Sequence, residues 1–236
     1  MSRLKIIAPC PDVAWAKRLT YSAKQHGLEV LCYSMDRPHG SPHNGDIQGT
    51  YVVELLPQLD DEYIMALDAP DTMVMADEDE IMEKFFKFNQ GFVISAETNN
   101  ILPTCGITEA LEAYPGRYKF PNGGAWIGER LCALETIKRC TELYRHKPLD
   151  PTLDLDAPQA WLTEALFEKT MYFGVDRDAV IFQSTMGWAA NDVEIRRGRM
   201  HNLYTNTIPC VAHYNGQRND LSTFYRQFGK IYGPVF

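Results

Sequence analysis

Residues 4–33 carry the clearest indication of the fold and read LKIIAPCPDVAWAKRLTYSAKQHGLEVLCY. Leu4–Ala8 is a short apolar run of the kind that forms a buried strand, and Val13–His26 has apolar residues at helical spacing. Gly27 follows that helix at the position where a left-handed C-cap residue is favoured. A second apolar run, Leu28–Tyr33, predicts the next strand. This β-α-β order predicts two parallel strands in an α/β sheet.

The alternation of strands and helices continues along the chain. Further strands are predicted at Tyr63–Leu67, Phe92–Ser95 and Ala179–Phe182. Further helices are predicted from Asp77 to about Gln90, from about Glu129 to Tyr144, and from about Pro158 to Met171, the first of them opened by Asp77 and Glu80 at capping-box spacing. Without a repeat or a linker, residues 1–236 are expected to form one α/β domain, in which helices flank a central mixed, mostly parallel sheet.

The composition is that of a globular protein and excludes several other classes. Of the 236 residues, 45% are hydrophobic and 23% charged, which excludes collagen-like, disordered and coiled-coil chains. No apolar run approaches the roughly 20 residues that span a bilayer. The N-terminal residues lack the features of a signal peptide, and the six cysteines form no C-x-x-C pair. We therefore expect a cytoplasmic protein with reduced thiols and no membrane partner.

Two carboxylates directly after a predicted strand are the strongest chemical signal. Asp68 and Asp71 follow Tyr63–Leu67, which places them at the carboxyl edge of a parallel sheet, where open α/β folds bind ligands. Their oxygens suit Mg²⁺ or Mn²⁺, and such an ion could neutralise a diphosphate leaving group. The alternative is a solvated turn, in which Asp and Pro are both favoured.

Two side chains in the C-terminal part are further candidate ligands. His213 ends a short apolar run before a turn, and imidazole is a common ligand of transition metals. Arg218 could hold a phosphate through its planar guanidinium. A structural role for the histidine and a surface position for the arginine are the alternatives.

Three other segments have the composition of ligand-binding loops. Asn122-Gly123-Gly124 allows a close backbone approach to a ligand, because glycine adds no Cβ, although a tight turn before a strand explains the same residues. Asp154 and Asp156 precede the helix that contains Gln159 and could serve as acceptor-binding residues or bases, or lie in a surface loop. Asp36–Gly49 is long and aperiodic, as functional loops often are.

Several short motifs follow one another in a specific order between Tyr63 and Gly216. They are Asp68-Ala-Pro-Asp71, Phe92-Val-Ile-Ser-Ala-Glu97, Tyr114-Pro115 with Lys119-Phe-Pro-Asn-Gly-Gly-Ala-Trp-Ile-Gly128, Ile181-Phe-Gln183 after Asp176, and His213-Tyr-Asn-Gly216 after Pro209. In content and order they resemble the glycosyltransferase domain of the procollagen lysyl hydroxylase group and its relatives among collagen glucosyl- and galactosyltransferases.

The resemblance implies a GT-A fold, a Rossmann-like α/β sandwich that binds a UDP-sugar and Mn²⁺. The implied metal ligands are Asp68, Asp71 and His213. The residues expected to bind the nucleotide and the sugar are Asn122, Gly123, Gly124, Asn215, Gly216 and Arg218. The residues expected to act in catalysis on the acceptor side are Asp154, Asp156 and Gln159.

The activity implied by the resemblance is metal-dependent transfer of a hexose, glucose or galactose, from a UDP-sugar to a hydroxyl. The acceptor is left open between a protein, a glycan and a modified nucleic-acid base. A net charge of -8 argues against a general nucleic-acid binder, and Arg196–Arg199 is the only dense basic run that favours a polyanion.

Three departures from the family pattern keep other functions open. The Asp-Asp-Gln signature is here Asp156-Ala-Pro-Gln159, Leu102 stands where the family has a tryptophan, and Asn219 stands where it has a diphosphate-binding lysine. A non-catalytic nucleotide-binding protein with a decayed GT-A site is therefore one alternative. A metal-dependent phosphohydrolase that uses the same carboxylates is the other.

Overall fold

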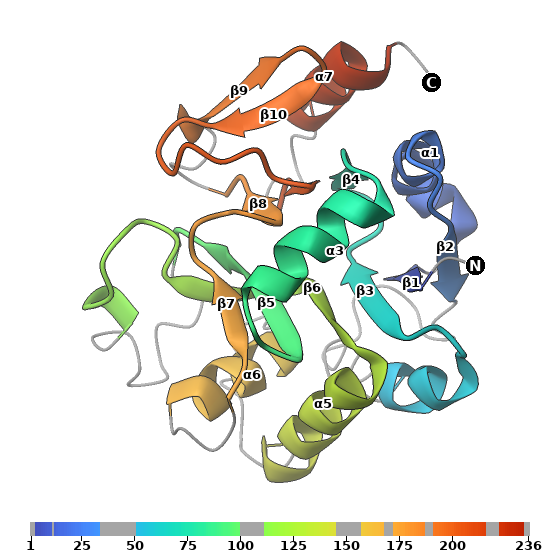
Figure 1. The fold of residues 1–236 in the computed structure, drawn as a ribbon, viewed down its shortest axis with the longest axis vertical. Coiled ribbons are helices and arrows are strands. Elements are labelled where there is room, and N and C mark those ends of the chain that lie inside the picture. The colour runs from blue at the N-terminus through green and yellow to red at the C-terminus, as the bar shows by residue number, and fades with distance from the viewer. Residues whose placement is uncertain are drawn as a thin grey trace.

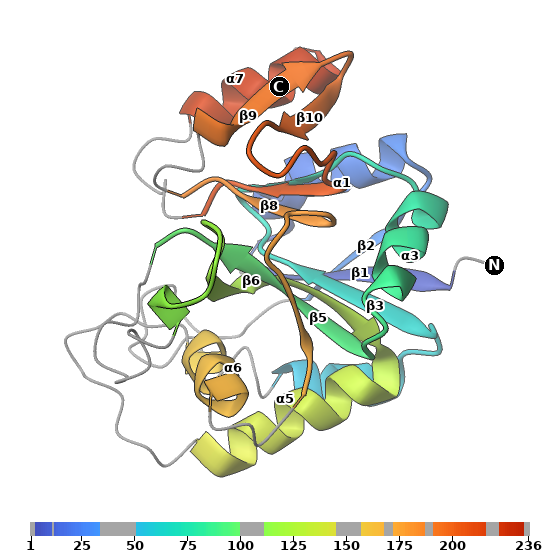
Figure 2. The ribbon, with the colours of Figure 1, turned by 60° about the vertical axis from the view of Figure 1, so that its left-hand side comes forward.

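The computed structural model describes residues 3–10, 12–33, 51–99, 111–144, 157–167, 172–186, 191–215 and 222–233. Within these residues a six-stranded sheet forms the centre of the molecule, with helices on both of its faces. A smaller three-stranded sheet lies over one face, and an antiparallel hairpin with the last helix lies beyond it (Figures 1 and 2). None of the helices in these residues is long and apolar enough to cross a membrane.

The large sheet is mixed and mostly parallel, as predicted. Its strands are, in spatial order, β2 (Val30–Tyr33), β1 (Leu4–Pro9), β3 (Tyr63–Leu67), β6 (Phe120–Glu129), β5 (Phe92–Glu97) and β7 (Gly174–Asp176). Strand β1 is parallel to β2 and β3, and β5 is parallel to β7, whereas β6 is antiparallel to both of its neighbours. The start of β6 therefore lies at the edge where β3 and β5 end.

The smaller sheet brings a late strand beside an early one. Its order is β4 (Thr72–Val74), β11 (Val211–His213) and β8 (Phe182–Ser184), with β11 antiparallel to β4 and parallel to β8. The hairpin consists of β9 (Val193–Arg196) and β10 (Arg199–Asn202). The structure also contains the helices η1 (Val13–Ala16), α1 (Lys17–Gln25), η2 (Leu56–Gln58), α3 (Glu78–Lys87), α5 (Arg130–Tyr144), α6 (Ala157–Phe167) and α7 (Ser222–Tyr232).

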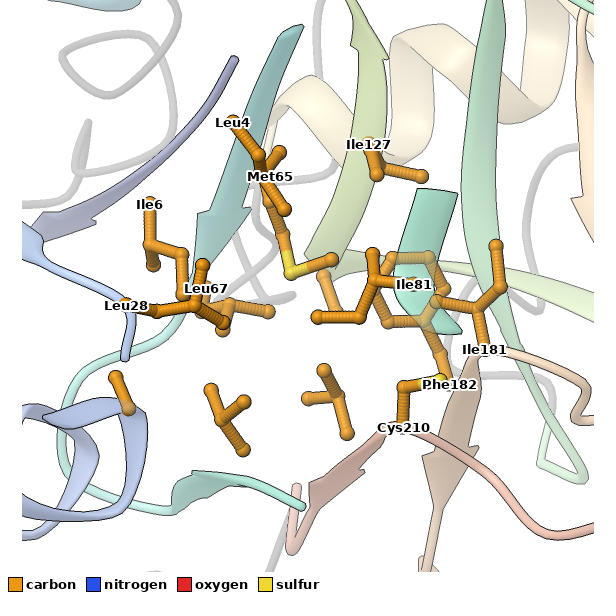
Figure 3. Close-up of a cluster of buried hydrophobic side chains, with 14 of the residues drawn as sticks. Leu4, Ile6, Leu28, Met65, Leu67, Ile81, Ile127, Ile181, Phe182 and Cys210 are labelled. Carbon is orange, nitrogen blue, oxygen red and sulfur yellow. The ribbon is translucent and has the colours of Figure 1, made fainter. Parts of the chain in front are cut away.

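Alternate residues of the central strands enter two different cores. In β3, Met65 and Leu67 join the core that α1, α3 and the smaller sheet cover (Figure 3). Ile64 and Ala66 of the same strand face the other core, which contains side chains of α5 and α6. Because both faces are covered, the central strands are almost continuously apolar, which explains the short apolar runs of the sequence.

The local signals at two helix ends are confirmed. Asp77 caps α3, where its side chain accepts a hydrogen bond of 3.0 Å from the Glu80 N–H. Gly27 follows α1 with a φ of +73°, the left-handed conformation that glycine adopts without strain. The predicted end of α3 near Gln90 is too late, since α3 ends at Lys87. Helix α6 is described as far as Phe167, and its predicted end near Met171 lies outside the described residues.

The predicted turn at Asn122-Gly123-Gly124 is wrong. These residues lie inside β6, whose pairing with β5 jumps from Ile94 opposite Trp126 to Ser95 opposite Asn122. The extra residues form a bulge, which bends a strand and redirects its side chains. Two glycines therefore indicated an irregular strand here, because glycine marks bulges as well as turns.

The strand predicted at Ala179–Phe182 is also misplaced, since β8 begins at Phe182. The preceding residues form a turn around the fully buried Asp176 carboxylate, which accepts hydrogen bonds of 2.8 Å from the N–H groups of Val180, Ile181 and Phe182. Ala179 has a φ of +50°, a conformation that is incompatible with a strand. Burial raises the pKa of Asp176 to about 6.

A salt bridge ties the hairpin to α3. Both terminal nitrogens of Arg199 donate to the Glu80 carboxylate at 2.9 and 2.8 Å, and Lys84 donates to the same carboxylate at 2.7 Å. The hydrogen bonds from Arg199 and Lys84 hold the pKa of Glu80 at about 2. Because this value lies below that of an unfolded glutamate, the pair stabilises the fold above about pH 4.5, and the stabilisation is lost as the pH falls towards 2.

Glu80→Gln is therefore expected to flatten the acid dependence of stability. Between pH 5 and pH 3, the free energy of unfolding of the wild type should fall by about 1–2 kcal/mol more than that of the variant, allowing for partial exposure of the pair. Urea unfolding at the two pH values measures this difference. Glu83→Gln is the matched control, because Glu83 forms an exposed pair with Lys87 on the same helix. Parallel pH profiles for wild type and Glu80→Gln would contradict the assignment.

Candidate metal centre

Asp68, Asp71 and His213 meet at the edge of the large sheet. Each offers one ligand atom, and these atoms lie within 4.8 Å of one another. The His213 Nε2 atom is 3.6 Å from Asp68 Oδ2 and 3.5 Å from Asp71 Oδ1. Asp71 and His213 are buried, whereas the Asp68 side chain is 33% exposed, so the cluster is open on the side of Asp68.

The strand pattern explains why His213 points at the two carboxylates. Along β11, Val211 enters the core against the large sheet and Ala212 enters the core beneath α7. Because side chains alternate along a strand, His213 faces the large sheet again. It lies opposite Thr72 of β4, so the connection between β3 and β4 places Asp68 and Asp71 beside it.

Gly124 provides the space in which the cluster forms. A Cβ atom on this residue would lie 2.3 Å from His213 Cε1 and 2.5 Å from Asp68 Oδ2. Its carbonyl oxygen also accepts a hydrogen bond of 2.9 Å from the Asp68 N–H, so the backbones are in direct contact. The glycine that the sequence indicated for close approach to a ligand thus makes room for two candidate ligand side chains.

Two atoms of the cluster, Asp71 Oδ1 and His213 Nε2, are buried and have no hydrogen-bond partner among the residues that the structure describes. Buried polar atoms are almost always paired, because an unpaired one costs about 1–3 kcal/mol. Burial lowers the pKa of His213, but the carboxylates of Asp71 and Asp68 outweigh this effect and raise it above its usual value. Both the unpaired atoms and the electrostatics are those of a cation site.

The donor set fits a divalent metal ion. Bonds of about 2.1 Å separate neighbouring ligands of one ion by about 3–4 Å, which is the range of the two distances from His213 Nε2. Two carboxylates and one imidazole form a mixed oxygen and nitrogen set, which suits Mn²⁺ better than Mg²⁺.

A buried polar network surrounds Glu97, the last residue of β5. Its side chain is fully buried, and its carboxylate accepts hydrogen bonds from Asn122 at 3.1 Å, Gln159 at 3.0 Å and Asn215 at 2.7 Å. Burial raises the pKa of Glu97, and the three amide donors counteract this rise. The network contacts the ligand cluster, because the side-chain oxygen of Asn122 (Oδ1) lies 3.1 Å from His213 Nδ1.

The other candidate residues from the sequence belong to the buried network or lie outside the described residues. Gln159 accepts a hydrogen bond of 2.8 Å from the Gly123 N–H in addition to its bond to Glu97, so both of its polar groups are engaged within the protein. Asn215 likewise accepts a bond of 2.6 Å from Ser184. The remaining candidates lie outside the described residues, and their roles stay predictions: Asp36–Gly49, Asp154, Asp156, Gly216 and Arg218.

Glu97 is the residue that the chemical analysis of the sequence passed over, although it belongs to one of the family-like motifs. The signal that could have identified it is the same one that identified Asp68. Asp68 directly follows an apolar strand and Glu97 is the last residue of another, and both strands end at the same edge of the sheet.

A pocket adjoins the cluster on the side of α5 and α6. It runs from Asp68 and Gly124 past Tyr33 to Trp126 and Trp161, and is mostly apolar and aromatic. Ligand sites commonly combine apolar walls with a few polar groups at one end. The cluster and this pocket therefore form one candidate site.

The chain matches a family model over most of its length. The family is described as the PLOD GT domain, and the matched residues are 12–227. Among curated proteins, Uncharacterized protein R699 of Acanthamoeba polyphaga mimivirus is 26% identical over 178 residues, which cover 73% of this chain and 36% of that protein. The chain thus spans about a third of the length of this relative.

Two solved structures resemble the fold over nearly the whole chain. One is a glycosyltransferase involved in the glycosylation of the major capsid of PBCV-1, with a TM-score of 0.58, 12% identity and coverage of 97% of this chain and 98% of that one. The other is the galactosyltransferase LgtC in complex with donor and acceptor sugar analogs, with a TM-score of 0.51, 16% identity and coverage of 96% and 95%. Both likenesses support the GT-A fold.

Gly124→Ala is expected to impair metal binding without unfolding the protein. The added methyl group overlaps His213 and Asp68 and forces them apart, so the affinity for Mn²⁺ should fall about 10–100-fold, as it does when the support of a metal ligand is disturbed. Isothermal titration with Mn²⁺ measures the loss. The control is Gly229→Ala in α7, where a Cβ meets nothing within 4 Å. Equal Mn²⁺ affinity in Gly124→Ala and Gly229→Ala would contradict the inference that metal binding needs the space beside Gly124.

Proposed function

This chain belongs to the PLOD GT domain family and is a glycosyltransferase domain, and on that premise we propose that it transfers a hexose from a UDP-sugar to a hydroxyl group with the help of Mn²⁺. The proposed metal ligands are Asp68, Asp71 and His213. The observation that carries the proposal is the convergence of these three side chains, two of whose buried atoms, Asp71 Oδ1 and His213 Nε2, have no hydrogen-bond partner within the described part of the chain.

In this proposal the protein residues hold and shield the donor. When bound, Mn²⁺ supplies positive charge that stabilises the departing diphosphate. Asp68, the most exposed member of the cluster, forms the open edge at which the donor enters. Gly123 brings a backbone without a side chain to the same edge, so that a sugar diphosphate can lie close to the strand.

The adjoining pocket is proposed to take part of the donor. Tyr33 and Pro9 lie where β2 and β1 end, at the edge that open α/β folds use for nucleotides. The LgtC structure contains donor and acceptor sugar analogs, which supports a donor site in this similar fold.

The acceptor is proposed to be a hydroxyl on a protein or a glycan. The basic run Arg196–Arg199 favours a polyanionic acceptor in the sequence, but Arg196 pairs with Glu194 at 2.8 Å and Arg199 pairs with Glu80. Much of the positive charge of this run is thus balanced by carboxylates. The PBCV-1 enzyme is involved in glycosylation of a capsid protein, which favours a protein-linked acceptor by analogy.

For Gln159 we propose a supporting role instead of the catalytic role expected from the sequence. Its amide nitrogen donates to Glu97 and its carbonyl oxygen accepts from Gly123, which leaves neither group directed at a substrate. We assign it to holding the Gly123 wall of the site. Asp154 and Asp156 remain the proposed acceptor-side carboxylates.

Thermal unfolding with nucleotides tests the donor and metal together. UDP at 100 times its dissociation constant should stabilise the wild type by about 2.7 kcal/mol in the presence of Mn²⁺, and the effect should vanish with EDTA. GDP and ADP should give no shift. Asp68→Ala and Asp71→Asn should abolish the Mn²⁺-dependent shift, whereas Asp79→Asn removes an exposed carboxylate from α3 and should preserve it.

The same measurement separates the alternatives. A missing shift with every nucleotide would favour a decayed donor site, and a shift that survives Asp68→Ala would contradict the proposed ligand set.

Product analysis distinguishes a transferase from a phosphohydrolase. With a UDP-hexose, Mn²⁺ and a series of hydroxyl acceptors, the transferase should divert sugar into a glycoside at the expense of free hexose. Asp71→Asn should reduce both products by at least about 100-fold, since it removes one of the groups that stabilise the departing diphosphate. Release of free hexose or sugar phosphate in equal amounts with every acceptor would instead indicate a hydrolase.

A further inference from the structure

Glu97 lies at the centre of a network that fixes the orientation of three side-chain amides. Asn122 and Gln159 both donate to its Oε1 atom, and Asn215 donates to Oε2. A carboxylate accepts hydrogen bonds and has none to give, so each amide must present its nitrogen to Glu97. The carbonyl oxygens of all three amides consequently point away from it.

Backbone N–H groups support the same orientation from the opposite side, through bonds to neutral amide oxygens that are weaker than bonds to the charged Glu97 carboxylate. The Gly124 N–H donates to Asn122 Oδ1 at 3.1 Å, and the Gly123 N–H donates to Gln159 Oε1 at 2.8 Å. A backbone N–H cannot change from donor to acceptor. The Asn122 amide is thus held with its nitrogen on Glu97 and its oxygen on the bulge of β6.

This orientation determines which ring nitrogen of His213 carries the proton. The Asn122 oxygen lies 3.1 Å from His213 Nδ1, and an amide oxygen can only accept. This contact is a hydrogen bond when the neutral imidazole carries its proton on Nδ1, which leaves a lone pair on Nε2. Nε2 is the buried unpaired atom that faces Asp68 and Asp71.

We propose that Glu97 is a positioning residue that sets the tautomer of His213 through Asn122 and so prepares Nε2 to bind a metal. This inference rests on the proposed metal-dependent function. Glu97 does not touch the ligands itself. It acts through Asn122, because its carboxylate sets the orientation of the Asn122 amide that contacts His213.

Glu97→Gln tests the chain of contacts because it keeps the size of the side chain and adds a donor. The new amide cannot accept from all three neighbours, so at least one neighbouring amide loses its acceptor. A reversed Asn122 would direct its nitrogen at His213 Nδ1 and favour the proton on Nε2. The affinity for Mn²⁺ should fall about 10–100-fold, the range seen when an outer-shell partner of a ligand histidine is removed.

The direct readout is the tautomer of His213 in metal-free protein. Long-range proton–nitrogen spectra of histidine-labelled protein at pH 9, assigned with His213→Ala, distinguish a proton on Nδ1 from one on Nε2. The wild type should carry it on Nδ1 and Glu97→Gln should show a loss of this form. The double variant Glu97→Gln with Asn122→Asp should regain it, because a carboxylate at 122 accepts from Nδ1 in either orientation.

Asp176→Asn is the matched control. Asp176 is also fully buried and also accepts three hydrogen bonds, but none of them leads to His213. This variant should destabilise the fold and leave both the tautomer and the Mn²⁺ affinity unchanged.

Three results would overturn the inference: a wild-type proton on Nε2, an unchanged tautomer and Mn²⁺ affinity in Glu97→Gln, or an equal loss in Asp176→Asn. The first of these needs no variant and so does not depend on whether Glu97→Gln folds. If the wild type binds no Mn²⁺, the proposed function fails, while the tautomer still decides the role of Glu97.

Discussion

The hydrogen bond from the Asp68 N–H to the Gly124 carbonyl is the contact on which the site depends. It holds the end of β3 against the bulged start of β6, an antiparallel strand between two parallel ones. Because Gly124 lacks a side chain, this close approach leaves a space where a methyl group would otherwise lie, and His213 and Asp68 fill it. The bulge, Gly124 and the antiparallel direction of β6 thus act together to form this space.

The site lies where two sheets meet, and this explains its polar interior. Strand β3 brings Asp68 from the large sheet, β11 brings His213 from the smaller one, and Glu97 of β5 connects the two through Asn122 and Asn215. An isolated buried carboxylate would cost several kcal/mol, but three amide donors compensate for the lost hydration of Glu97. The members of this network are buried beside the apolar cores that cover the two faces of the large sheet.

Two predictions from the sequence were wrong, each at a place where a side-chain or tertiary contact sets the backbone conformation. Asn122-Gly123-Gly124 has the composition of a turn, yet its amides and carbonyls are paired with Gln159, Asn122 and Asp68, so it remains within the strand as a bulge. The residues before β8 are apolar enough for a strand, but the Asp176 carboxylate captures three of their N–H groups and turns them. In the first case the hydrogen-bond partners include residues that are distant in the sequence, and in the second the partner is a side chain. The apolar periodicity of the sequence reveals neither kind of contact.

The sequence by itself determined the α/β class, the confirmed strands and helix caps, and the candidate ligands Asp68, Asp71 and His213. The class, the strands and the caps follow from local rules, since apolar period and capping residues are encoded by neighbouring positions, whereas the ligand set that includes His213 follows from the resemblance of ordered motifs to a known family. Only the tertiary structure decided that the three ligands converge, that Gly124 makes room for them, and that Glu97 orients Asn122 against His213. The reason is that strand order and register bring together residues far apart in the chain, and a single sequence carries no record of those distances.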